Sequence, residues 1–79
     1  MYAAELREHE MERALAEEMV REILAIGKSH NRLNDLIEAH VTDMALKKEF
    51  KRPLGEALAS GAVLLLPIIR QYPDLDPDK

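Results

Sequence analysis

Few side chains in this sequence could do chemistry, and they are scattered. The 79-residue chain has three histidines, two serines and no cysteine. His9 lies one helical turn from Glu5 and near Glu12, a spacing that could bring an imidazole and two carboxylates together. Ligands on one exposed helix make a weak metal site, and the Glu-x-x-His pairs of di-iron bundles are absent. We therefore predict neither a metal site nor a bound cofactor.

Nucleophilic and phosphate-transfer chemistry also lack their patterns. Ser29 and His30 are neighbours in sequence, which does not replace a base positioned in space beside a nucleophile. The run Gly27-Lys28-Ser29 imitates the end of a phosphate-binding loop, but the upstream glycine and the preceding strand are missing. A small helical chain also has little room for a deep substrate pocket. The sequence predicts a protein that is not an enzyme.

His40 shares a predicted helix face with Leu36, Ile37 and Met44. This placement predicts a buried or interfacial histidine with one hydrogen bond satisfied. The alternative is a pH sensor, because protonation there would place a charge in an apolar contact. His30 falls in a polar segment, where we expect it to be solvated.

A compact basic cluster could bind phosphate groups. Its cations are Lys47, Lys48, Lys51 and Arg52, with Phe50 between them. Nucleic-acid binding by a dimer, through duplicated clusters, is therefore the alternative function. The formal charge of −4 and the acidic N-terminal segment oppose it. No exposed recognition helix with helix-turn-helix spacing is evident either, so cations that complement a helix end are the favoured interpretation.

The composition is that of a small helical domain. Apolar residues make up 47% of the chain and charged residues 33%, dominated by the helix formers Leu, Ala, Glu, Lys and Arg. We predict an all-α protein whose single domain spans residues 1–72. The helices are expected at residues 3–27, 32–51 and 53–72, as a bundle or a hairpin with a kinked third helix. Residues 73–79 are expected to form an extended, frayed acidic tail.

Local signals set these boundaries. Gly27 is a typical helix stop, and Ser29 or Asn31 could cap the next helix. Pro53 suits a first helical position. Pro67 interrupts the third segment, but the apolar stripe keeps its phase across it, which favours a kinked helix over a stop. The small residues between Gly55 and Ala62, both included, predict close packing against another helix.

Association is the main functional prediction. The third segment carries a wide apolar stripe that two partner helices in a monomer could cover only in part. We expect homodimerisation through this stripe, with a monomeric three-helix bundle and a patch for a different protein as alternatives. The residues of the stripe are Leu54, Leu58, Gly61, Leu65, Ile68, Ile69 and Tyr72.

The function predicted from these features is protein–protein interaction, as a small adaptor, regulator or inhibitor. A second contact surface is expected at the acidic residues Glu5, Glu8 and Glu12, which otherwise form a solvated helix start. The longest apolar run, residues 62–69, is too short to span a bilayer. The N-terminus does not resemble a signal peptide, and membrane association lacks flanking cations beyond the basic cluster. We therefore predict no transmembrane segment and a cytoplasmic location.

Overall fold

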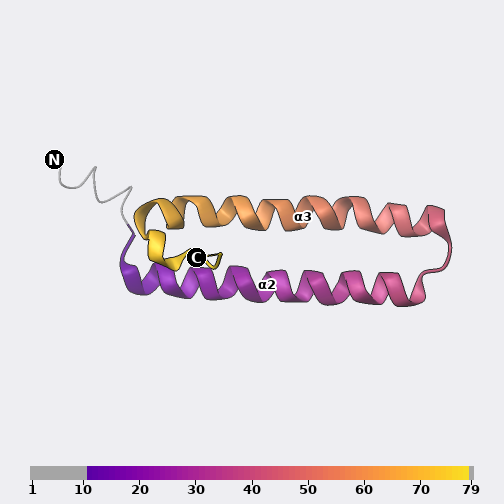
Figure 1. Ribbon diagram of the computed structural model, residues 1–79, viewed down its shortest axis with the longest axis horizontal. Coiled ribbons are helices and arrows are strands. Elements are labelled where there is room, and N and C mark those ends of the chain that lie inside the picture. Colours follow the sequence, from indigo (N-terminus) through magenta and orange to yellow (C-terminus); the bar gives the residue numbers. More distant parts are fainter. Residues whose placement is uncertain (1–10, 79) are drawn as a thin grey trace.

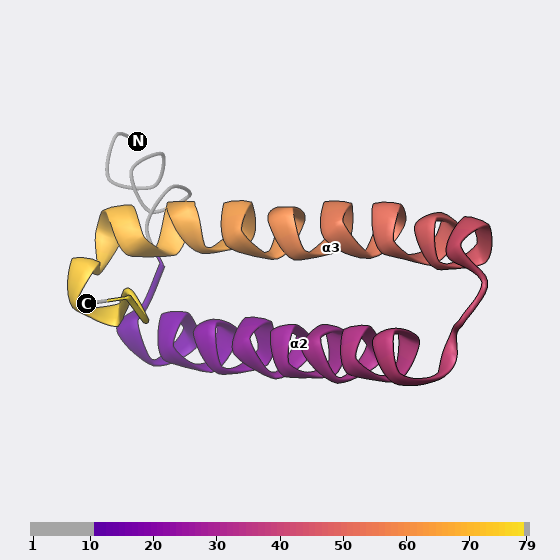
Figure 2. The same ribbon diagram turned by 45° about the vertical axis from the view of Figure 1, so that its right-hand side comes forward.

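The computed structural model describes residues 11–78, and this part of the chain is a helical hairpin (Figure 1). Helix α2 spans Arg13–His40 and helix α3 spans Met44–Gln71, each with 28 residues. A 3-10 turn, η1, follows at Pro73–Leu75. The two long helices lie side by side and antiparallel, as the rotated view in Figure 2 also shows. The prediction of an all-α protein is confirmed.

The predicted division into helices at residues 3–27, 32–51 and 53–72 is wrong where the structure describes the chain. Residues 28–31, expected to be a connector, lie inside α2, and Gly27 does not stop the helix. The reason is a continuous stripe on α2 that is shielded by α3 and recurs at alternating intervals of four and three residues. Its buried and half-buried members are Ala16, Val20, Ile23, Gly27, His30, Asn34 and Ile37. Packing along this stripe outweighs the roughly 1 kcal/mol that a glycine costs in a helix.

The real break in the chain comes at residues 41–43. The Asp43 side chain caps α3, accepting hydrogen bonds from the backbone N–H groups of Ala45 at 2.9 Å and Leu46 at 3.4 Å. These bonds satisfy donors that have no partner inside the helix. The caps predicted at Ser29 or Asn31 are therefore wrong, because both residues lie within α2.

Two prolines lie inside α3. Pro53 does not start a helix, contrary to prediction, and α3 continues through Pro67 to Gln71 as the phase of the stripe predicts. The prolines are separated by fourteen residues, which is about four helical turns, so they lie on the same side of α3. Both are exposed. Each missing N–H therefore interrupts the helix on a side that α2 does not cover.

The core is thin and lies toward the chain termini. Ala16, Val20 and Ile68 form its buried centre. The partly buried side chains packed against this centre are Met11, Ile23, Leu65, Tyr72 and Leu75. Ile37 and Leu54 are the other buried apolar residues of residues 11–78, nearer the connecting loop.

Polar contacts close the terminal end of the hairpin. The Tyr72 hydroxyl donates a hydrogen bond to the Met11 carbonyl oxygen at 2.6 Å, and the Met11 N–H donates to Gln71 Oε1 at 2.8 Å. Arg13 forms an ion pair with Asp74, and its guanidinium lies 5.4 Å from the centre of the Tyr72 ring. Residues 73–75 therefore turn back as η1 instead of extending as expected, because Leu75 gains contact with the core.

An ionic contact joins the two helices near the loop. Glu38 of α2 accepts from Lys51 Nζ at 2.5 Å and from Lys47 Nζ at 3.4 Å. These hydrogen bonds, Lys51 first, lower the pKa of Glu38 below its usual value. The three groups are partly exposed, so the contact is screened by water.

The surface along which α2 and α3 face each other, which we call the seam, includes Gly27 and Gly61. Alanine at either glycine should stabilise the hairpin. A Cβ atom at Gly27 or Gly61 would meet nothing within 4 Å, and no glycine has a positive φ. A Cβ atom at Gly55 would also meet nothing within 4 Å, so the close packing predicted around Gly55 and Gly61 is absent within the hairpin. We expect Gly27→Ala and Gly61→Ala each to raise the free energy of unfolding by about 0.5–1 kcal/mol in urea titrations. Gly55→Ala, at an exposed open position, is the control for helix propensity alone; a loss of stability at Gly27 or Gly61 relative to it would contradict the open seam.

The Glu38 contact should be pH-dependent. Because the pKa of Glu38 is lower when the chain is folded, its contribution is complete above the unfolded pKa of about 4.3 and is lost as the pH falls through the folded pKa. Glu38→Gln should therefore destabilise the hairpin at pH 7 and have a smaller effect at pH 3, measured by urea unfolding at both. Glu49→Gln, which removes a carboxylate that forms no ion pair within residues 11–78, is the control. An equal loss at both pH values would show that ionisation of Glu38 is not responsible.

Candidate interaction surface

The stripe predicted for self-association faces α2 for the most part. Leu54 and Ile68 are buried, and Leu65 and Tyr72 pack against the core. Gly61 and Ile69 are half-buried, while Leu58 is 37% exposed. These residues hold the hairpin together, so a charge at Leu65 would test folding rather than association.

A different set of apolar side chains remains uncovered. Among residues 11–78, thirteen large apolar side chains are exposed, whereas five apolar residues are buried. Eight of the thirteen follow one side of the hairpin, which we call the apolar side. They are Leu15, Met19, Ile26, Leu33 and Leu36 of α2, with Leu46, Phe50 and Leu64 of α3.

Seven-residue spacing places the α2 members on one side of that helix. Met19, Ile26 and Leu33 are separated by seven residues each, which is close to two full turns. Leu15 lies four residues before this series and Leu36 three residues after it, so both extend the same side. The result is an exposed stripe along α2 that is distinct from the one facing α3.

A shallow hollow shows that the α3 members lie on the same side. Leu15, Met19 and Ile23 of α2 line this hollow together with Leu64 of α3, and Glu18 and Glu22 are its charged members. Phe50 lies fourteen residues before Leu64, and therefore on the same side of α3. The exposed stripes of the two helices therefore lie on the same side of the hairpin and meet at this hollow.

A second hollow, of about 390 Å³, opens where the two seam glycines lie. We call it the glycine hollow. Its walls are mainly apolar, and His30, Lys28 and Asn31 are its polar members. His30 is half-buried at this position, contrary to the expectation of a solvated histidine, because the seam continues through residues 28–31.

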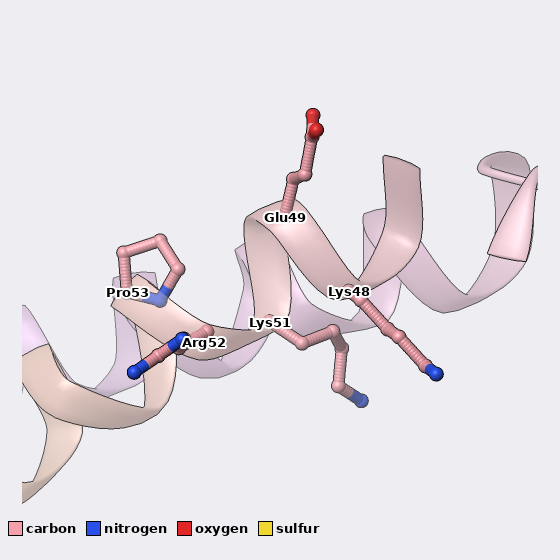
Figure 3. Close-up of a pocket in the computed structure, with 5 residues that line it drawn as sticks. All are labelled: Lys48, Glu49, Lys51, Arg52 and Pro53. Carbon is pink, nitrogen blue, oxygen red and sulfur yellow. The ribbon is translucent and has the colours of Figure 1, made fainter. Parts of the chain in front are cut away.

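The basic cluster is partly neutralised. Lys47 and Lys51 share Glu38, and Arg52 Nε lies 3.8 Å from Glu56 Oε1. Lys48 is the member without an ion-pair partner in residues 11–78. Figure 3 shows Lys48, Lys51 and Arg52 around a shallow surface, with Glu49 directed away from them. Three carboxylate contacts thus reduce the positive charge that the cluster could offer to phosphates.

The other candidate residues are peripheral or outside the described range. Glu5, Glu8 and His9 lie outside the described residues. Glu12 is the exposed N-cap residue of α2, and its side chain makes no capping hydrogen bond. His40 is exposed as the last residue of α2, so the expectation of a buried histidine is wrong within the hairpin. The His40 side chain is exposed because α2 ends at this residue, where the helix was predicted to continue.

By length and composition alone, α3 could cross a membrane. An 18-residue window within it has a mean hydropathy of 1.4, and 11% of that window is buried. Apolar helices that pack in soluble bundles share these properties, so the finding is weak support for a membrane span. It does show that α3 carries more apolar surface than α2 covers.

The described residues assemble no recognisable chemical site. Residues 11–78 contain no group of three or more His, Cys, Asp or Glu side chains placed to hold a metal ion. Within the same range, no hydrogen bond links Ser29 or Ser60 to a histidine. No family model matches the chain, and neither a curated protein nor a solved structure is significantly similar to it.

Proposed function

We propose that this protein is a helical protein–protein interaction module that acts as a homodimer. The observation that carries the proposal is the apolar side, where eight large exposed side chains from both helices form one surface. Continuous apolar surface on a soluble chain marks an interaction site. The dimer contact proposed is therefore the apolar side of the hairpin, and not the stripe of α3 that faces α2.

The thin core supports the need for a partner. A chain below about 80 residues gains only about 3–5 kcal/mol from a single core unless packing is exceptional. Among residues 11–78, five apolar residues are buried, and one of them is an alanine. Covering the apolar side would add apolar burial at about 25 cal/mol for each Å² removed from water. Association and folding would then stabilise each other.

A second copy fits the apolar side better than an unrelated partner of unspecified shape. Its surface has the same length and the same apolar character, so a two-fold contact uses one surface twice. Two helical hairpins that meet by such faces form a four-helix bundle, in which each helix buries two stripes instead of one. This arrangement covers Ile26 and Leu64 without changing the contacts inside either hairpin.

The oligomeric state tests the proposal directly. We expect light scattering after size exclusion to give about 18 kDa, twice the 9.0 kDa of the chain, at micromolar concentration. Ile26→Glu should shift the protein toward the monomer, since it places a charge in the proposed contact. Leu66→Glu is the matched control: both side chains are 51% exposed, but Leu66 is not part of the apolar side.

Each result has a definite meaning. A wild-type chain that stays monomeric and helical over the whole concentration range overturns the homodimer. Equal loss of dimer in both variants overturns the assignment to the apolar side. If Ile26→Glu unfolds, circular dichroism against concentration for the wild type decides, because a folding-linked dimer loses helix on dilution.

A further inference from the structure

The spacing of the exposed apolar residues on α2 is nearly the same before and after Ile26. Met19 and Leu33 each lie seven residues from Ile26. Leu15 lies eleven residues before it and Leu36 ten residues after it. All five belong to the apolar side and are exposed.

The polar residues on this side of α2 follow the same symmetry. Glu22 precedes Ile26 by four residues, and Ser29 follows it by three. Glu12 and His40 each lie fourteen residues from Ile26, at the two ends of α2, and both are exposed. A reversal of α2 about Ile26 therefore superposes apolar on apolar and polar on polar positions.

We propose that two copies pack α2 against α2 in antiparallel orientation, with the two-fold axis passing at Ile26. This inference rests on the proposed homodimer and specifies its geometry. Met19 of each copy then meets the partner's Leu33, and Leu15 meets the partner's Leu36. At the ends, the Glu12 carboxylate meets the partner's His40 imidazole, while Ile26 packs against its own copy. An isologous contact requires this self-complementary pattern.

The charge distribution along the hairpin favours the same orientation. The terminal half, residues 11–27 and 61–78, holds seven acidic residues and three arginines, a net charge of −4. The loop half, residues 28–60, holds six lysines and arginines and five acidic residues, a net charge of +1. A dimer with both loops at one end would place the two acidic halves together. The antiparallel dimer instead places each acidic half beside the partner's loop half, which lowers the repulsion.

The glycine hollow gives the centre of this contact room to pack. Ile26 lines the hollow together with Ala57 and Leu64 of α3. With the axis at Ile26, the hollows of the two copies face each other across it. The partner's side chains can then fill space that Gly27 and Gly61 leave open within one hairpin.

Single cysteines test the geometry, because the natural chain has none. A disulfide needs Cα atoms about 4.4–6.8 Å apart, a condition that residues at a two-fold axis can meet with their own copies. Under mild oxidation, Ile26→Cys should convert most of the protein to a covalent dimer on a non-reducing gel. Met19→Cys alone should not form a covalent dimer, because residue 19 of one copy would lie about 21 Å from residue 19 of the other, measured along the α2 helix axis.

Mixtures of variants test the register. Met19→Cys mixed with Leu33→Cys should give mixed disulfide dimers, whereas Leu66→Cys mixed with Leu33→Cys should stay at background. Ile26→Cys mixed with Ala57→Cys should give fewer mixed dimers than Ile26→Cys gives with itself, because the axis brings the two copies of residue 26 together.

The outcomes separate this inference from the proposed function. A wild-type dimer in which residue 26 cross-links to residue 57 and not to its own copy overturns the antiparallel α2 contact and leaves the homodimer standing. A wild-type dimer without cross-links in any of these variants also overturns this geometry. A wild-type monomer in light scattering overturns both. Cross-linking of Ile26→Cys with itself and of Met19→Cys with Leu33→Cys supports both.

Discussion

In a hairpin of two helices, each helix can bury only one stripe of side chains against the other. The stripe on α2 includes Gly27, His30 and Asn34, which are only half-buried. The seam therefore yields a core of five buried apolar residues over two helices of 28 residues each. Within residues 11–78, thirteen other large apolar side chains stay exposed, because no third layer of that range covers them. The exposed apolar side and the interaction that we propose for it both follow from this limit.

The seam is not uniform along its length. Its terminal end is apolar and is closed by the Tyr72 hydrogen bond to Met11 and by the Arg13–Asp74 ion pair. Its loop end depends on Glu38 and two lysines, which are partly exposed to solvent. Between them lies the glycine hollow. Stability within one hairpin is thus concentrated near the termini, and the middle would gain most from the second copy that we propose, which would fill the open space.

The arrangement of charge separates a polar side from an apolar one. Glu38, the carboxylate that joins α3 to α2 near the loop, also partly neutralises the basic cluster, which weakens its suitability for a polyanion. Catalytic groups are not brought together in residues 11–78, and the apolar side has no charged residue from Ile26 to Leu36 along its α2 stripe. Association through that side therefore remains the function that we propose.

The sequence by itself determined that the chain is helical, because composition is a local property, and the phase of the apolar stripe favoured a helix that continues past Pro67 without deciding it. It did not reveal where the helices end. Gly27 and Pro53 resemble a stop and a start, but each local preference is outweighed by packing that continues along the seam. Asp43, the real cap, was hidden because Val41 and Met44 extend an apparent apolar face. Only the tertiary structure decided which stripe of α3 packs against α2 and which stays exposed. The helix carries two apolar stripes, and α2 can cover only one of them.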